Sequence, residues 1–325
     1  MFETDQFFRE AGGYRYNRAF LTLALMRLFR SYSRPVPTPV ALAIGNFDGV
    51  HLGHTALIGR LVKVAAQLSV VPTVLSCEPH PREFFAPDSA PARLSTFREK
   101  LELLADCGVS QAMVCRFNHA FASLSAEQFV TDVLVGGLKV RHVVVGDDFR
   151  FGKGRRGDFG LLQQLGARYG FTAEAMGSLV VDGERVSSSG VRLALAAGDM
   201  AHAAKLLGRP YVMDGQVVHG QKLARQLGFA TANLRIKHNP LPMTGVFAVE
   251  VIGLAPLPLA GVANLGVRPT VGGTRPLLEV HLFDFDRDIY GAHISVRFVH
   301  KLRDEQRFPN FDALKAQIAA DAAAA

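Results

Sequence analysis

The sequence contains no tryptophan, only three cysteines and no long apolar run, and these shortages exclude several classes of protein. The cysteines, Cys77, Cys107 and Cys115, are odd in number and include no C-x-x-C pair, which indicates reduced core thiols in a cytoplasmic protein. No run approaches the length of a transmembrane helix, so we expect no membrane partner. No basic block carries interleaved aromatic residues, so we expect no nucleic-acid partner either.

The length of 325 residues indicates two domains, each able to bury a core of its own. The net charge of +7 suits anionic substrates, although scattered surface lysines and arginines give the same value. Residues 19–29 resemble a short signal peptide, but no small-residue cleavage site follows, and Arg27, Arg30 and Arg34 interrupt the run. We therefore expect residues 1–35 to be a loosely ordered N-terminal extension.

One segment of the first half combines glycines with two histidines. It consists of Gly45, Asn46, Phe47, Asp48, Gly49, Val50, His51, Leu52, Gly53 and His54. The apolar run Val40–Ile44 predicts a strand before it, and apolar residues at helical spacing predict a helix after it, for which we consider a start at Leu52. Such a turn binds anions, because glycines let the backbone come close and a helix N-terminus presents unpaired amides. His51 and His54 are three residues apart, so both imidazoles can face one phosphate.

Strand and helix patterns alternate along the rest of the first half. The predicted strands cover residues 72–75, 112–114 and 143–145, and the predicted helices cover residues 96–107, 126–134 and 161–169. Alternation of this kind predicts a parallel sheet wrapped by helices, that is, a Rossmann-like α/β domain. Its ligands should bind at the carboxyl ends of the strands.

Polar segments follow two of these strands, and another opens a later helix. Glu78–Pro81 and Gly146–Gly152 are each either a ligand loop or simply a stiff loop or turn. Ser187 and Ser188 open a helix, for which serine is a common N-cap. Arg192 lies four residues after Ser188, so its guanidinium group can reach the same helix start and bind a pyrophosphate. Capping and phosphate binding are compatible there.

The pattern changes after a predicted helix at residues 200–207. Short β-rich stretches, separated by turns rich in glycine, proline and asparagine, cover residues 211–218, 246–251, 278–283 and 294–298. They predict a small antiparallel β-barrel, and residues 311–320 predict an amphipathic C-terminal helix that covers one side of it. We expect the first domain to span residues 36–207 and the second to span residues 208–325.

Three residues of the second half suit phosphoryl transfer, although no G-K-[ST] sequence of a Walker loop occurs. Thr231 and Asn233 are two apart, so in an extended chain both side chains point the same way and offer oxygen ligands to Mg²⁺. Glu279 interrupts an apolar run, and its carboxylate can accept a proton from a substrate hydroxyl. From the residues alone, the favoured alternatives are a turn for the first pair and an outward strand residue or ion pair for Glu279.

Taken together, these segments resemble the bacterial bifunctional riboflavin kinase/FAD synthetase family. The resemblance covers about residues 40–321 and rests on several motifs in register. These are Gly45–His54, the Pro-His-Pro loop, Arg93–Thr96, Phe121–Ser125, Gly146–Gly152, Arg156–Asp158, Ser187–Arg192, Val217–Gly220, Leu227–Phe229, Gly261–Asn264, Arg268–Thr270 and Glu279–Asp284.

The resemblance implies that the first domain is an FMN adenylyltransferase. His51 and His54 would then bind ATP phosphates, and Arg192 would bind the departing β and γ phosphates. Asp148 and Asp199 would help to place the nucleotide and the flavin. The other residues expected to bind nucleotide or flavin there are Gly45, Asn46, Phe47, Asp48, Gly49, Ser187 and Ser188.

The resemblance also implies that the second domain is a flavokinase. Thr231 and Asn233 would carry Mg²⁺ and ATP beside Gly228, and Glu279 would activate the riboflavin 5′-hydroxyl. The nucleotide loop contains Ala224 and Ala230, where the family usually has a glycine and a proline. These departures motivate the alternative of a monofunctional FAD synthetase whose barrel binds flavin without phosphorylating it.

The sequence thus predicts a cytoplasmic enzyme that phosphorylates riboflavin to FMN and adenylylates FMN to FAD, with Mg²⁺ and ATP serving both steps. Its expected partners are these small molecules, and a transient homo-oligomer is left open. Two further alternatives are a flavin-responsive binding protein and a nucleotidyltransferase that acts on another small phosphate ester. Intact His51, His54, Arg192 and Glu279 favour an enzyme over the former, and the presence of a barrel disfavours the latter.

Overall fold

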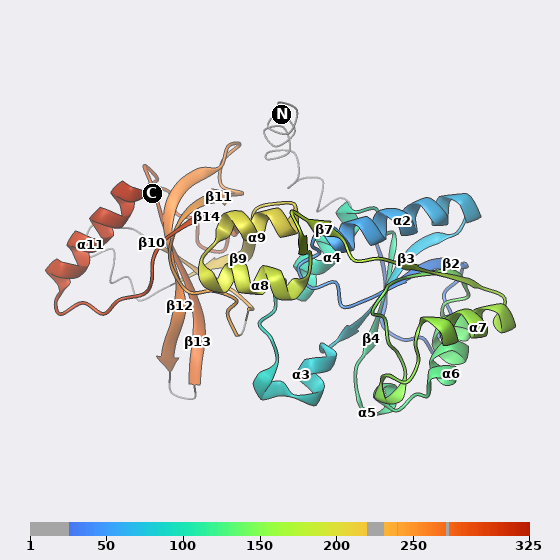
Figure 1. Ribbon diagram of the computed structural model, residues 1–325. Coiled ribbons are helices and arrows are strands. Elements are labelled where there is room, and N and C mark those ends of the chain that lie inside the picture. The colour runs from blue at the N-terminus through green and yellow to red at the C-terminus, as the bar shows by residue number, and fades with distance from the viewer. Residues whose placement is uncertain (1–25, 220–230, 239, 271–272) are drawn as a thin grey trace. The chain divides into compact units, whose positions relative to one another are not determined.

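The computed structural model describes residues 26–219, 231–238, 240–270 and 273–325. Contacts divide the chain into two compact units, whose elements are labelled in Figure 1. Of the described residues, 26–91 and 100–186 form the sheet unit, and 92–99 and those from 187 onward form the barrel unit. Three residues of the expected nucleotide loop, Ala224, Gly228 and Ala230, lie outside the described residues.

The core of the sheet unit is a six-stranded sheet in the order β1-β4-β3-β2-β5-β6. Every neighbouring pair is parallel, which confirms the predicted Rossmann-like sheet. The strands are β1 (Arg27–Phe29), β2 (Val40–Ile44), β3 (Val71–Glu78), β4 (Gln111–Arg116), β5 (Val140–Gly146) and β6 (Thr172–Met176). The chain passes from β2 to β3 and β4 on one side and returns to β5 on the other side of β2. The strand order therefore reverses around β2, and in such sheets ligands bind at the carboxyl ends of the strands at this point.

Helices cover both faces of this sheet. Helix α2 lies on one side of the sheet and helices α6 and α7 lie on the other (Figure 1). Helix α2 buries an apolar face made by Leu57, Ile58, Leu61, Val64 and Ala65. The helices and short hairpin strands are α2 (Leu52–Leu68), α3 (Pro81–Phe85), η1 (Pro87–Ser89), α4 (Phe97–Asp106), α5 (His119–Ala122), α6 (Ala126–Gln128), the π-helix η2 (Phe129–Gly137), η3 (Lys153–Arg155), α7 (Phe159–Tyr169), β7 (Val180–Val181) and β8 (Glu184–Arg185).

Residues 26–35 differ from the expected loosely ordered extension. Strand β1 pairs in parallel with β4, and the Arg27 amide donates a hydrogen bond of 3.0 Å to the Ser110 carbonyl. The chain then passes so close to Gly137 that a Cβ there would lie 2.7 Å from the Tyr32 carbonyl oxygen. The expectation was wrong for these ten residues because unpaired backbone groups at the edge of β4 accept even a three-residue strand. Residues 1–25 lie outside the described residues.

The barrel unit is built on a closed barrel in the order β10-β13-β12-β11-β14-β9. All of its strand pairs are antiparallel, as predicted. The strands are β9 (Val212–Val218), β10 (Thr231–Arg235), β11 (Gly245–Ile252), β12 (Leu259–Thr270), β13 (Gly273–Leu282) and β14 (His293–Arg303). Leu278 and Val280 are buried, whereas Glu279 between them is half-buried. Because side chains alternate along a strand, Glu279 lies on the outer face of the barrel.

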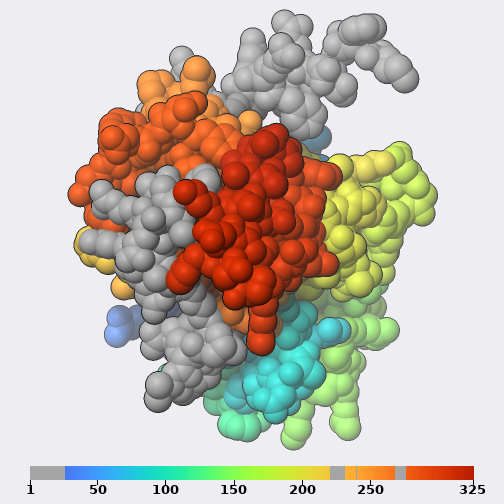
Figure 2. Space-filling view, turned by 90° about the vertical axis from the view of Figure 1, so that its left-hand side faces the viewer, coloured from blue at the N-terminus to red at the C-terminus, as the bar shows by residue number. Residues whose placement is uncertain are grey.

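The predicted C-terminal helix is present as α11 (Phe311–Ala324), and it lies against the barrel, as Figure 2 shows in red. An ion pair ties it to strand β14, since Arg303 Nη2 lies 2.7 Å from Asp321 Oδ2. Asp321 is buried, so salt in the solvent screens this pair less than it screens a surface pair.

Two helices that precede the barrel in the chain also belong to the barrel unit. These are α8 (Ser188–Ala197) and α9 (Met200–Leu207). Helix α9 contacts β14 and buries Met200, Ala203, Leu206 and Leu207. The predicted division between residues 207 and 208 thus falls inside one compact unit.

Candidate active sites

The loop between β2 and α2 carries the two histidines, and its backbone is unusual. Phe47 and Val50 have positive φ angles of 52° and 40°, and Gly49 has a φ angle of 79°. Residues other than glycine rarely adopt this backbone conformation, because it costs free energy. Such residues are found most often at functional sites. The Phe47 ring is buried over Gly45, where a Cβ would lie 3.1 Å from the ring. The loop therefore folds tightly at the carboxyl end of β2, the position expected for a ligand.

His51 and His54 lie together at the first turn of α2, as their spacing predicts. His51 is the N-cap, and its Nδ1 accepts a hydrogen bond of 3.3 Å from the His54 backbone amide. The two rings stack with centroids 3.7 Å apart and an interplanar angle of 17°. Since Nδ1 of His51 is the acceptor, a neutral His51 ring carries its proton on Nε2, which is the atom that can donate to an anion.

Two neighbours fix the orientation of the histidine rings. The edge of Phe47 meets the His54 ring at a centroid distance of 5.3 Å. A Cβ on Gly53 would lie 3.2 Å from Cε1 and Nδ1 of His51, which is tighter than ordinary contact. Gly53, between the two histidines, thus leaves room for the His51 ring. Asp48, in the same loop, is buried.

The loop after β5 contains the predicted Asp148 next to Asp147. Asp148 is exposed, and its Oδ2 accepts a hydrogen bond of 2.9 Å from Arg185 Nη2. Asp147 instead accepts bonds from the backbone amide and the hydroxyl of Ser178. Asp147 therefore stabilises the loop through Ser178, and Asp148 lies in the loop that follows β5, the strand next to β2 in the sheet.

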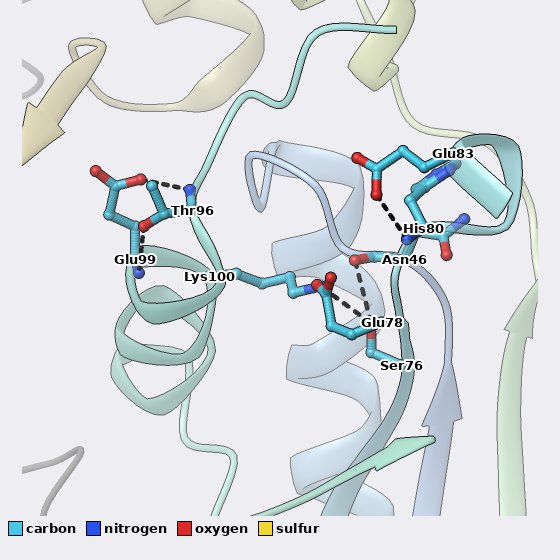
Figure 3. Close-up of polar contacts among 8 residues, drawn as sticks. All are labelled: Asn46, Ser76, Glu78, His80, Glu83, Thr96, Glu99 and Lys100. Atoms are coloured by element: carbon cyan, nitrogen blue, oxygen red, sulfur yellow. Dashed lines mark hydrogen bonds and ion pairs between the residues drawn. The ribbon is translucent and has the colours of Figure 1, made fainter. Parts of the chain in front are cut away.

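The Pro-His-Pro loop after β3 forms a helix cap. His80 Nδ1 accepts a hydrogen bond of 3.1 Å from the Arg82 amide, and the Glu83 carboxylate accepts one of 3.0 Å from the His80 amide (Figure 3). This capping box starts helix α3 and places Phe84 and Phe85 behind it. The structure therefore gives this segment the stiffness of a capped turn, one of the two open alternatives.

Sequence reasoning missed an aromatic group at the same edge of the sheet. The rings of Phe84, Phe85 and Phe117 meet edge to face with centroids 5.2 to 5.6 Å apart. Phe85 is 68% exposed, so its ring is largely open to solvent. Helix α3 follows β3 and Phe117 follows β4, so the group lies at the carboxyl ends of two neighbouring strands.

In the barrel unit, two of the predicted ligand-binding residues before the barrel, Ser187 and Asp199, act as helix caps. Ser187 Oγ accepts a hydrogen bond of 3.1 Å from the Gly190 amide, and Ser188 begins α8. Asp199 Oδ1 accepts one of 2.9 Å from the His202 amide at the start of α9. Arg192 Nε donates to the Ala92 carbonyl at 2.6 Å. The N-terminus of α8 still presents backbone amides that suit a phosphate.

The predicted kinase residues meet on the barrel wall. Asn233 of β10 lies directly opposite Glu279 of β13, and Thr231 lies opposite His281. Directly opposite residues have Cβ atoms about 4.5 to 5.5 Å apart, so the amide and the carboxylate are neighbours. Thr231 and Asn233 are two apart and point the same way, as predicted. Gly228, expected beside them, lies outside the described residues.

Another polar group beside Glu279 was missed. Glu279 also pairs with Asn264 of β12, which hydrogen-bonds to Glu305. Burial raises the pKa of the Glu305 carboxyl, while the Asn264 bond opposes that rise. Asn264 Oδ1 is buried and has no hydrogen-bond partner among the described residues. An asparagine inside the β-rich sequence Gly261–Gly266 was the signal that could have revealed this position.

The oxygen atoms of Thr231, Asn233 and Glu279 are hard ligands, which Mg²⁺ prefers, so this group fits the expected ion. The part of the chain that the structure describes contains no cluster of three or more His, Cys, Asp or Glu side chains that could bind a metal ion. Among the helices of the described residues, none combines the length and apolar character that crossing a bilayer requires.

The fold and these two groups of residues define a two-part, nucleotide-dependent transferase. One part is a parallel α/β unit with an H-x-G-H helix start, and the other is a closed barrel with threonine, asparagine and glutamate on its wall. A family model described as FAD synthetase matches residues 33–190, and one described as riboflavin kinase matches residues 207–325.

Similar proteins agree with both matches. The bifunctional riboflavin kinase/FMN adenylyltransferase of Escherichia coli (strain K12) is 49% identical over 299 residues, which are 92% of this chain and 96% of that protein. The protein of the same description from Pseudomonas fluorescens is 50% identical over 293 residues, with 90% and 94% covered. The chain belongs to the bifunctional riboflavin kinase/FMN adenylyltransferase family.

A solved structure has the same fold along nearly the whole chain. It is described as a macrolide-efflux protein from Streptococcus pneumoniae, and it is 27% identical with a TM-score of 0.78. The match covers 91% of this chain and 97% of that chain.

Proposed function

We propose that this chain catalyses two successive transfers: ATP phosphorylates riboflavin to FMN, and a second ATP adenylylates FMN to FAD. The presence of both family modules in one chain carries this proposal. The stacked histidine pair in the sheet unit and the Asn233–Glu279 pair in the barrel unit support it, because they supply different chemistry.

In the adenylylation step, a phosphate oxygen of FMN attacks the α-phosphorus of ATP, and pyrophosphate leaves. Negative charge moves toward the bridging oxygen as its bond to the α-phosphorus breaks. His51 and His54 at the N-terminus of α2 are arranged to stabilise that charge, together with the first amides of the helix. We also propose that Arg192 and the start of α8 bind phosphate, because a guanidinium group binds two phosphate oxygens at once.

The loop residues Gly45 to Gly49 would enclose the nucleotide, and Asp148 and Asp199 would place the nucleotide and the flavin. The exposed Phe85 ring, with Phe84 and Phe117 beside it, offers a planar apolar surface at the carboxyl edge of the sheet. A flavin ring is planar and aromatic, so it can stack there.

In the kinase step, Thr231 and Asn233 would bind Mg²⁺, which neutralises charge on the transferred phosphate. Glu279 would accept the proton of the riboflavin 5′-hydroxyl while that oxygen attacks the γ-phosphorus of ATP and ADP leaves. The register of β10 and β13 pairs Glu279 with Asn233, which supports this assignment, because such a transfer requires the base beside the metal ligand.

We assign adenylylation to residues 36–207 and phosphorylation to residues 208–325, with α9 packed on strand β14 of the barrel. We also propose a cytoplasmic enzyme whose partners are small molecules. All three cysteines are free thiols, and burial raises the pKa of the Cys77 thiol to about 12. Such thiols suit a reducing compartment.

The test is to incubate purified protein with ATP, Mg²⁺ and either riboflavin or FMN, and to separate FMN from FAD. We expect FMN followed by FAD from riboflavin, and FAD alone from FMN. FAD from FMN with no FMN from riboflavin would instead establish the monofunctional alternative.

A further inference from the structure

A buried lysine is linked by hydrogen bonds to the Gly45–His54 loop of the sheet unit. The Lys100 side chain, from helix α4, is only 2% exposed, and its Nζ lies 2.9 Å from Oε1 of Glu78. The same ammonium group donates a hydrogen bond of 3.2 Å to Oγ of Ser76. Glu78 and Ser76 both lie at the carboxyl end of β3, where Figure 3 shows Lys100 reaching them from α4.

The hydroxyl of Ser76 continues this chain of hydrogen bonds to the loop. Ser76 Oγ donates to the backbone carbonyl of Asn46 at 3.4 Å (Figure 3). An ammonium group can only donate, so Ser76 must accept from Lys100, and its own proton is directed to Asn46. The direction of each hydrogen bond from Lys100 to the loop is therefore fixed.

Stability alone does not explain a charge at this position. Taking an ammonium group out of water is costly, and a well-packed apolar side chain in place of a buried ion pair is often neutral or stabilising. The backbone of the neighbouring Gly45–His54 loop, in contrast, needs contacts that hold its conformation. Phe47 and Val50 hold positive φ angles, which persist only where surrounding contacts impose them.

We propose that Lys100 is a positioning residue for adenylyl transfer. Its ammonium group orients Ser76, Ser76 fixes the Asn46 carbonyl, and the Asn46–Val50 turn is thereby held in the conformation that presents the histidines to ATP. Lys100 itself is too deeply buried to contact substrate. The inference rests on the proposed role of the Gly45–His54 loop in nucleotide binding.

The experiment compares Lys100→Met, Ser76→Ala and the double variant in the full chain. Lys100→Met keeps an unbranched stem and removes the charge, whereas Ser76→Ala leaves the lysine–glutamate pair intact. We expect kcat/KM for FMN adenylylation to fall roughly 10- to 100-fold in Lys100→Met, with a lower kcat and a higher KM for ATP. We expect a loss of up to roughly tenfold in Ser76→Ala. The double variant should be no worse than Lys100→Met, because both residues act along one path.

Two controls separate positioning from folding. Riboflavin phosphorylation by the same chain should stay at the wild-type rate in every variant, since its site lies in the barrel unit. Lys139→Met removes an exposed lysine of the sheet unit, whose Nζ lies 3.5 Å from the Pro37 carbonyl, and should leave adenylylation unchanged. Ser76→Thr keeps the hydroxyl and should restore most of the rate lost in Ser76→Ala.

Unchanged adenylylation kinetics in both Lys100→Met and Ser76→Ala would overturn the inference. If Lys100→Met does not fold, the pair Ser76→Ala and Ser76→Thr decides, because equal rates in the two would mean that the hydroxyl positions nothing. His54→Ala tests the underlying function separately. Full FAD formation in His54→Ala would remove the nucleotide role of the loop, whereas loss there with normal Lys100 and Ser76 variants rejects only the positioning role.

Discussion

The imidazole of His51 caps helix α2 by accepting a hydrogen bond from the backbone amide of His54, while the two rings stack 3.7 Å apart. Each histidine therefore helps to place the other. Replacing His51 removes both the proposed phosphate ligand and a helix cap, and the experiment has to separate these two effects.

We predict that His51→Ala, His51→Asn and His54→Ala each lower kcat for FAD formation by roughly 100- to 1,000-fold, while FMN still accumulates from riboflavin. Asparagine is a good N-cap, so His51→Asn keeps the helix start and loses only the imidazole. The thermal midpoint of His51→Asn should therefore be closer to the wild-type value than the thermal midpoint of His51→Ala is. Normal FAD synthesis by His51→Asn would reduce His51 to a structural cap.

Gly53 leaves space for the His51 ring, and this gives a second prediction. In Gly53→Ala the new Cβ would lie 3.2 Å from the ring, so the ring has to shift by a few tenths of an ångström. We expect kcat/KM for adenylylation to fall roughly tenfold without loss of stability, because alanine also favours the helix.

Gly59 on the same helix supplies the matched control. A Cβ there meets nothing within 4 Å. Gly59→Ala should therefore raise the free energy of unfolding by about 0.5 to 1 kcal/mol and leave the kinetics unchanged. Equal kinetics in the two alanine variants would show that the ring does not need the space.

The sequence predicts those features best that depend on periodic burial. Apolar spacing predicts the helix that follows the Gly45–His54 segment and gives the bounds of α9 at residues 200–207, because both helices bury one continuous face. Strand β1 was missed because three residues carry no periodic pattern, and it forms only against the edge of β4. Strand β12 was missed because glycine, asparagine and proline interrupt its apolar residues, and the ladders to β11 and β13 stabilise it instead.

Prediction of the candidate site residues from the sequence has the same limit. The spacing of His51 and His54 and that of Thr231 and Asn233 fix which side chains share a face, so these pairs could be predicted. Lys100 could not, because a lysine in an amphipathic helix normally faces water, and only tertiary contacts show that it is buried. The pairing of Asn233 with Glu279 needed the register of two strands 46 positions apart, which no local pattern contains.

A third prediction concerns Glu99, a buried carboxyl in the barrel unit. Its Oε1 accepts a hydrogen bond from the Asp214 amide, and its Oε2 lies 3.4 Å from His238 Nε2. Burial, with the nearby Asp214 carboxylate as a smaller cause, raises the pKa of Glu99 to about 7, although hydrogen bonds from Asp214 and Thr96 oppose the rise.

The folded protein therefore retains a proton on Glu99 that the unfolded chain releases near its ordinary pKa of 4.5. Between these values the folded state binds more protons, so the free energy of unfolding falls as pH rises from about 4.5 to about 7 and is then constant. The full effect is on the order of 3 kcal/mol.

Calorimetry of wild type and Glu99→Gln across this pH range measures the effect as a difference in slope. The glutamine side chain has one oxygen and cannot accept both backbone hydrogen bonds, so we expect Glu99→Gln to be less stable than wild type by a constant amount. The free energy of unfolding of Glu99→Gln should nevertheless decline less than that of wild type as pH rises. Parallel curves for the two proteins would contradict the raised pKa.

A fourth prediction follows from the packing of α9 on β14. A fragment of residues 208–325 lacks Met200, Leu206 and Leu207 and leaves their apolar partners on the barrel in water. Burying one such side chain contributes about 1.5 to 3 kcal/mol, so this fragment should melt well below a fragment of residues 187–325, which keeps both helices. Thermal unfolding followed by circular dichroism compares them, and equal midpoints would mean that the helices do not stabilise the barrel.

The last prediction tests the base of the kinase step. Glu279 lies opposite Asn233 on one side and Asn264 on the other, so its carboxylate is held between two amide-bearing strands. Glu279→Gln keeps the shape and removes the proton acceptor, so riboflavin phosphorylation should fall by roughly 100-fold or more while FMN adenylylation stays at the wild-type rate. Glu250→Gln is the matched control, because Glu250 also lies on a barrel strand and pairs with Arg297 at 2.6 Å, yet has no assigned role in catalysis. Removing a partly exposed ion pair should cost at most about 1 kcal/mol of stability and leave both activities intact. If Glu279→Gln phosphorylates riboflavin as fast as Glu250→Gln does, the carboxylate is not the base, and the activation of the hydroxyl has to come from elsewhere on the barrel.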